Sequence, residues 1–177
     1  MAASAGCVFM ESWQRLDQAN EEEARSLLTQ CCGARRWVER MLERRPFANR
    51  ASLHEAATEE WNKLEASDWR EAFSHHPKIG DRDSLRTRFP ATHTLSEREQ
   101  AGVGGASEAM LDALAEGNRQ YEERFGYIFI VCATGKSAEE MLTLLYQRLP
   151  NDQDSELRIA ASEQQKITAI RLDKLSR

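Results

Sequence analysis

The 177-residue sequence has little of what marks membrane, secreted or nucleic-acid-binding proteins. Its longest apolar run, residues 127–133, is far shorter than the roughly 20 residues that a membrane-spanning helix needs. Residues 1–10 lack the basic start and apolar stretch of a secretory signal peptide. With 24 basic and 29 acidic side chains the formal charge is −5, whereas binding to a phosphate backbone needs a basic face. We therefore expect neither a membrane nor a nucleic-acid partner.

Signals for metal sites and disulfides are equally scarce. The four cysteines are Cys7, Cys31, Cys32 and Cys132. They form no C-x-x-C motif, and the adjacent Cys31 and Cys32 cannot serve as a zinc knuckle. His54 and His93 have no metal-ligand spacing with the other two histidines. The sequence therefore predicts reduced thiols that are buried as small hydrophobic groups in a cytoplasmic protein, and no metal.

Helical periodicity dominates the chain. Asn20 with Glu23, and Ser137 with Glu140, match the capping box that begins a helix. Gly33 is expected to close the first of these helices as a C-terminal cap, and prolines end others. The basic stretch 35–45 alternates with glutamates and is typical of a solvated, ion-paired helix face.

The fold class that follows is all-α. We predict one domain over residues 1–177, a bundle of seven or eight helices; whether residues 1–9 are ordered stays open. A long polar loop over residues 75–95 and an apolar extended segment over residues 126–135 interrupt the bundle. Polar loops of this length in compact domains are usually functional or disordered.

The step from helix to loop at His75, His76 and Pro77 is the first candidate for chemistry. Histidine titrates near neutral pH and is a natural proton donor or base. Pro77 favours an extended conformation for His76. A protonated histidine that complements the dipole at a helix C-terminus explains the same residues equally well.

Two further segments have both structural and chemical interpretations. Ser96 with Glu99 matches a capping box, and the same helix start, together with Gln100, could bind a polar heterocycle. The apolar segment has main-chain groups that need partners, and an amide-rich ligand could supply them. For both segments, the chemistry of the residues by itself favours the structural interpretation over ligand binding.

Taken together, these pieces resemble the OHCU (2-oxo-4-hydroxy-4-carboxy-5-ureidoimidazoline) decarboxylase family. His-Pro-Lys-Ile-Gly occupies positions 76–80, and Ser-x-x-Glu-Gln-Ala-Gly occupies positions 96–102. The other matching stretches are residues 37–47, 118–130, 148–151, 156–157 and 163–172.

The resemblance implies an all-helical homodimer that decarboxylates OHCU to (S)-allantoin in urate degradation without a cofactor. It implies that His76 is the catalytic acid or base, or both, and that Glu99 is the catalytic carboxylate, with Glu97 as the alternative. The implied substrate-binding residues are Pro77, Ser96, Glu97, Arg98, Glu99, Gln100, Phe129, Ile130, Val131, Cys132, Ala133 and Arg171.

The chain departs from the animal members of that family in two places. Lys-Ile-Gly follows His-Pro where animal members have Asp or Glu followed by Leu-Ala-Gly, and the last residues, Lys-Leu-Ser-Arg, do not form a Ser-Lys-Leu peroxisomal signal. Both features favour a bacterial cytoplasmic enzyme. The alternatives are a cofactor-free hydrolase or isomerase of a related ureide, and a helical scaffold without catalysis.

Overall fold

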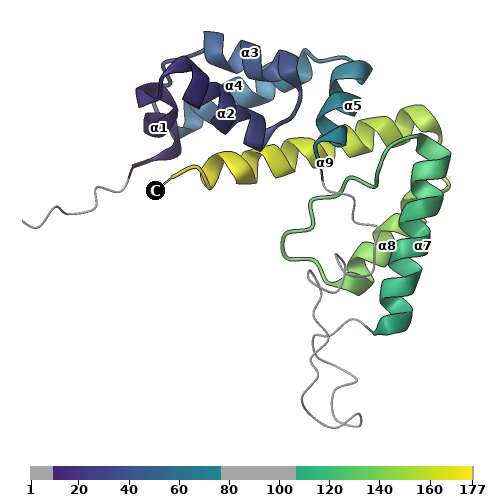
Figure 1. The fold of residues 1–177 in the computed structure, drawn as a ribbon. Coiled ribbons are helices and arrows are strands. Elements are labelled where there is room, and N and C mark those ends of the chain that lie inside the picture. The colour runs from purple at the N-terminus through teal and green to yellow at the C-terminus, as the bar shows by residue number, and fades with distance from the viewer. Residues whose placement is uncertain (1–9, 77–106, 177) are drawn as a thin grey trace, which may run out of the picture. The chain divides into compact units, whose positions relative to one another are not determined.

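The computed structural model describes residues 10–76 and 107–176 (Figure 1). These residues form eight α-helices and no strand, which confirms the all-α prediction. None of the described helices is long and apolar enough to cross a membrane. Residues 1–9 and the predicted polar loop beyond His76 lie outside the described residues. The helices are α1 (Ser12–Gln18), α2 (Glu21–Cys31), α3 (Arg35–Glu43), α4 (Arg50–Asn62), α5 (Ala66–Ser74), α7 (Glu108–Phe125), α8 (Ala138–Arg148) and α9 (Gln153–Asp173).

The chain groups into two compact units. Of the described residues, 10–75 and 164–176 form the first unit, and 76 and 107–163 form the second. Helix α9 contributes its first half to the second unit and its second half to the first. That residues 1–177 form a single domain stays a prediction.

Several helices begin where the sequence predicts, because side chains cap their free N–H groups. The Asn20 side chain accepts from the amide of Glu23 at 2.9 Å, and Glu23 accepts from the amide of Asn20 at 3.2 Å. Ser137 and Glu140 form the same reciprocal pair at the start of α8. Helix α1 was not predicted; it has only seven residues, too few to show a hydrophobic period.

The end of α2 differs from the expectation. The helix stops at Cys31, and its C-cap residue Cys32 is extended, with φ −145° and ψ 123°. The described glycines with positive φ are Gly126 and Gly135, so Gly33 does not act as a left-handed cap. Gly33 is needed for a different reason, the close approach of His75.

The core of the first unit combines residues from α1–α5 with the C-terminal half of α9. The indole of Trp37 is fully buried and donates to the carbonyl of Ala57 at 3.1 Å. Cys31 and Cys32 are buried, and this burial raises the pKa of both thiols to about 12. Cys132 is also buried with a free thiol, so the predicted role of buried cysteines as small hydrophobic groups is confirmed for these three.

The basic stretch on α3 is ion-paired, as predicted, but its partners lie on other helices. Arg36 pairs with Asp68 of α5 at 3.2 Å, and Arg44 pairs with Glu59 of α4 at 2.7 Å. Periodicity within one helix cannot reveal such partners, which are 15 to 32 residues away in the sequence. These pairs connect α3 to α4 and α5.

Arg44 also pairs with Glu60 of α4, whose side chain is only 6% exposed. Its carboxylate accepts from Lys63 at 2.8 Å and from Arg44 at 3.0 Å. Burial by itself opposes ionisation, but these two cations more than compensate and hold the pKa of Glu60 below its ordinary value of 4.5. A carboxylate with a lowered folded-state pKa stabilises the fold above the unfolded-state value and loses that contribution as the pH falls through the folded-state value.

We predict that Glu60→Gln lowers the free energy of unfolding by about 1–2 kcal/mol at pH 7, because the acceptor of two hydrogen bonds from cations loses its negative charge. The deficit should shrink as the pH falls from 4.5 through the lower folded-state pKa of Glu60, because the folded wild type then loses its carboxylate charge as well. Urea unfolding at pH 7, 5 and 3 measures it. A deficit that is independent of pH would contradict the ionic explanation.

Candidate functional site

The described part of the chain contains seven of the predicted site residues. Phe129, Ile130, Val131, Cys132 and Ala133 belong to the second unit, together with His76, and Arg171 belongs to the first. Pro77, Ser96, Glu97, Arg98, Glu99 and Gln100 lie outside the described residues, so their roles stay predictions.

Residues 129–133 run between α7 and α8 as neither helix nor strand, as predicted for the apolar segment. Phe129, Ile130, Val131 and Cys132 are buried, with exposed fractions of 2% to 8%. Buried main-chain groups without ladder partners must find others. Here side chains supply them.

Three charged side chains hold the main chain of this segment. Arg148 of α8 donates from Nη1 to the carbonyl of Ile130 at 2.8 Å. The carboxylate of Glu163 accepts from the amide of Cys132 at 2.7 Å, and Lys136 Nζ donates to the carbonyl of Cys132 at 2.7 Å. The arrangement fixes the segment at alternate residues, 130 and 132. Among the described residues, no hydrogen-bond partner reaches the main chain of Val131 between them.

Arg148 is itself held by a fully buried carboxylate. Glu156 is 0% exposed and accepts from Arg148 Nε at 2.8 Å and Nη2 at 2.5 Å. The Tyr121 hydroxyl donates to the same oxygen, and Asn151 Nδ2 donates to the other at 2.8 Å. The guanidinium also lies over the Phe129 ring, 4.6 Å from its centroid.

We call Tyr121, Arg148, Asn151 and Glu156 the Glu156 network. Burial, followed by the hydrogen bond to Glu156, raises the pKa of the Tyr121 phenol far above its ordinary value, so the hydroxyl stays a donor. All four side chains lie in stretches that match the family resemblance, but the sequence assigned them no role. Their contacts span up to 35 residues, which no local spacing rule detects.

Arg171 lies where α9 meets the end of α2. Its Nη1 donates to the carbonyls of Gln30 at 3.3 Å and Cys31 at 3.4 Å. These are among the last carbonyls of α2, which have no partner within the helix, and a cation there also complements the helix dipole. The two contacts orient the guanidinium, which has five N–H donors in all.

His76 follows directly on the end of α5. His75 is the C-cap residue of that helix, with its amide donating to Ala72 at 3.3 Å. The sequence prediction that a helix ends at this histidine pair is therefore confirmed. Whether His76 performs acid–base chemistry is not decided by its position.

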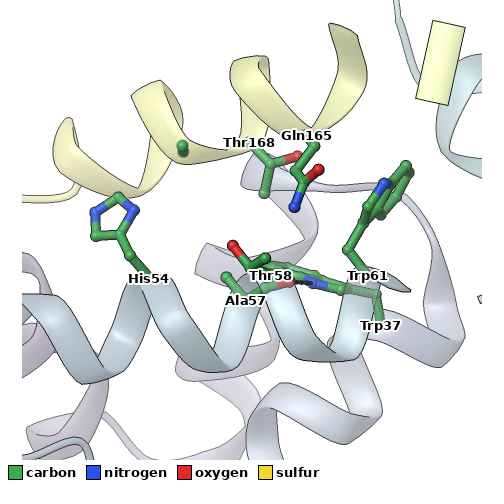
Figure 2. A pocket seen from close by; sticks show the side chains of 8 residues that line it. Trp37, His54, Ala57, Thr58, Trp61, Gln165 and Thr168 are labelled. Carbon is green, nitrogen blue, oxygen red and sulfur yellow. Dashed lines mark hydrogen bonds between the residues drawn. The ribbon is translucent and has the colours of Figure 1, made fainter. Parts of the chain in front are cut away.

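The first unit contains a separate small cavity of about 30 Å³, between α4 and the C-terminal half of α9 (Figure 2). Figure 2 shows the side chains of Thr58 and Gln165 at this cavity. Its lining residues are Trp37, His54, Ala57, Thr58, Trp61, Gln165, Thr168 and Ala169. About 10–15 Å³ of such space holds one water molecule, so this cavity suits one or two waters and is too small for a ureidoimidazoline. None of the predicted site residues lines it.

Metal-ligand geometry is not found in residues 10–76 and 107–176, where no three His, Cys, Asp or Glu side chains are grouped to hold an ion. The chemistry of the described site residues is instead that of hydrogen-bond donors and main-chain groups held in position. Such an arrangement can orient a polar, amide-rich molecule.

Comparison with known proteins gives consistent results. The model of the OHCU decarboxylase family matches residues 17–173. The uric acid degradation bifunctional protein TTL of Arabidopsis thaliana is 39% identical over 147 residues, which are 82% of this chain and 45% of that protein. The chain thus spans less than half the length of this plant relative. The 2-oxo-4-hydroxy-4-carboxy-5-ureidoimidazoline decarboxylase of Amia calva is 33% identical over 128 residues, 72% of this chain and 73% of the relative.

Solved structures resemble the chain as well. A crystal structure of OHCU decarboxylase in the presence of (S)-allantoin has a TM-score of 0.69 and 35% sequence identity, and the match covers 89% of this chain and 98% of that one. A crystal structure of (S)-allantoin synthase has a TM-score of 0.68 at 17% identity, covering 92% of this chain and 53% of that one. The second likeness concerns the fold alone.

We predict that Arg148→Met lowers the free energy of unfolding by about 3–5 kcal/mol, because it leaves the buried Glu156 carboxylate without its cation. Arg119 is a matched control: it pairs with Glu116 and Glu123, but its side chain is 58% exposed. Arg119→Met should therefore lower the free energy of unfolding far less than Arg148→Met does. Urea unfolding of both variants at pH 7 measures the difference, and equal losses would contradict the importance of burial.

Proposed function

Since the chain belongs to the OHCU decarboxylase family, we propose that it catalyses the decarboxylation of OHCU to (S)-allantoin in urate degradation, without a cofactor. The observation that carries this proposal is the match along almost the whole chain to a structure of OHCU decarboxylase obtained with (S)-allantoin. The family model, which covers residues 17–173, supports it independently.

The reaction itself makes few demands on the protein. The bond between the ring carbon and the carboxylate breaks, the carboxylate leaves as CO₂, and its electron pair passes into the imine and ureido-bearing ring of the substrate. A proton then adds to the neighbouring ureido-bearing ring carbon, which becomes the stereocentre of (S)-allantoin, while the hydroxyl on the decarboxylated carbon loses its proton and becomes a ring carbonyl. The substrate is its own electron sink, so the enzyme needs to orient it, relay a proton and protonate one face only.

The site residues divide this work. In our proposal His76 relays the proton, Glu99 hydrogen-bonds the substrate hydroxyl, and Arg171 binds its anionic or carbonyl oxygens. The contacts of Arg171 with Gln30 and Cys31 support this role, because they hold a flexible side chain in one direction. A preoriented guanidinium loses less freedom when it binds a carboxylate.

The apolar segment contributes main-chain contacts in this proposal. Charged side chains fix the main chain of Ile130 and Cys132. Between them, the amide and carbonyl of Val131 have no hydrogen-bond partner among the described residues. A ring with alternating N–H and C=O groups complements such a pair. We further propose that the chain acts as a cytoplasmic homodimer, which size-exclusion chromatography with light scattering can test for the assembly.

We predict that His76→Asn abolishes stereoselective allantoin formation while the far-ultraviolet circular dichroism of the folded protein stays unchanged. Asparagine keeps hydrogen-bonding capacity but cannot relay a proton near neutral pH, a loss worth roughly 10²–10⁴-fold in rate. Freshly generated OHCU is the substrate, and the chirality of the allantoin is followed by circular dichroism.

The same assay separates the alternatives. CO₂ release with (S)-allantoin supports decarboxylation, whereas ring opening or rearrangement without CO₂ would indicate a hydrolase or isomerase. No turnover by the wild-type chain would favour a scaffold. Full activity of His76→Asn would contradict the assignment of the proton relay.

A further inference from the structure

We propose that Gly33 is a positioning residue for catalysis, because only a residue without a side chain lets the end of α5 approach the turn after α2 and thereby fixes the His75–His76 step. This inference rests on the proposed function, since it assumes that His76 relays the proton. It concerns residues 32–34, which we call the α2–α3 turn.

Gly33 and His75 are in close contact. A Cβ atom at Gly33 would lie 2.3 Å from Cγ, 2.5 Å from Cβ and 2.6 Å from Cδ2 of His75. Real Cβ atoms essentially never come closer than 3.0 Å to such neighbours. A rotamer change would move Cγ and Cδ2 but not Cβ of His75, so it cannot remove the 2.5 Å overlap. The backbone at His75 would have to move.

The part of α5 before His75 has little freedom to move. The α5 helix that ends there is tied to the first turn of α3: the Glu71 carboxylate accepts from the amide of Arg35 at 3.2 Å, and Asp68 pairs with Arg36 at 3.2 Å. Ala72 and Phe73, just before the end of α5, are fully buried. A displacement of His75 is therefore taken up at the end of the helix, where the chain continues into His76.

The same region of the first unit also orients Arg171. Its guanidinium contacts the carbonyls of Gln30 and Cys31, which come immediately before the α2–α3 turn. The end of α2 and the turn after it therefore contact one proposed site residue, Arg171, and the residue before the other, His76. A side chain at position 33 would disturb the contact with His75. It would leave in place the carbonyls of α2 that Arg171 contacts.

This division predicts separate effects on kcat and KM. Gly33→Ala should lower kcat for OHCU by roughly 10- to 100-fold, as expected for a small misplacement of a reacting group, with KM within about threefold of wild type. Arg171→Met, measured in the same assay, should mainly raise KM. The proton relay should also respond: the pH at which kcat is half-maximal should move in Gly33→Ala.

A double-mutant cycle tests the contact itself. His75→Gly removes all three atoms that the new Cβ would meet, and glycine is compatible with the backbone of His75, at φ −83° and ψ −1°. Gly33→Ala in the His75→Gly background should therefore reduce kcat by less than about threefold relative to His75→Gly alone. A full loss of kcat in both backgrounds would overturn the inference.

Gly117 provides the matched control. It is a buried glycine in α7, and a Cβ there would come 2.5 Å from Cδ2 of Leu145, so alanine is crowded at this position too. Gly117→Ala can change the unfolding midpoint but should leave the pH profile of kcat unchanged. An equal shift of the pH profile in both variants would show a general effect of crowding and contradict the special role of Gly33.

The remaining outcomes are also decisive. If Gly33→Ala does not fold, the double variant should fold and be active, and failure of both would overturn the inference. An active, His76-dependent wild type with unimpaired Gly33→Ala would overturn the role of Gly33 alone. A wild-type chain that does not convert OHCU would overturn the proposed function, and the inference with it.

Discussion

The second unit depends on one buried charge, the carboxylate of Glu156. Such a group is costly to desolvate unless hydrogen bonds surround it, and here Arg148, Tyr121 and Asn151 supply them. This need for hydrogen-bond partners determines the contacts around Glu156. The cation that neutralises Glu156 is the group that also reaches the carbonyl of Ile130 and lies over Phe129. A helix–helix contact and the course of a non-helical segment therefore have one electrostatic cause.

In the first unit, main-chain carbonyls at the end of α2 also need partners. Carbonyls in the last turn of a helix lack partners within it, and Arg171 from α9 supplies donors to two of them. In both units an arginine satisfies main-chain carbonyls that regular hydrogen bonding leaves open. This use of arginine differs from the exposed pairs on α3, whose contribution to stability is small for each pair. Arginine suits the role because its planar group can contact several acceptors at once and stays charged when partly buried.

The sequence predicts those parts of the structure that depend on neighbours in the chain. Capping boxes at Asn20 and Ser137 are local, so the starts of α2 and α8 could be predicted to the residue. The apolar segment was recognisable by composition. The side chains that hold this segment could not be recognised from the sequence, because Glu163 and Arg148 contact residues 18 to 31 positions away. Gly33 is the clearest case: local rules interpret a glycine after a helix as a left-handed cap, whereas the structure uses its missing Cβ to admit His75.

The same distinction applies to the candidate site. Residues such as His76 and Arg171 are visible in the sequence because their chemistry or their motif marks them, but chemistry alone does not orient a side chain. In the proposed site, orientation comes from groups that take no part in the chemistry: Gly33 beside His75, and the carbonyls of Gln30 and Cys31 beside Arg171. For a substrate that delocalises its own charge, orientation and proton delivery are what the protein contributes to the rate. In the proposed mechanism, catalysis therefore depends on the main-chain packing at Gly33 as well as on the acid–base residue His76.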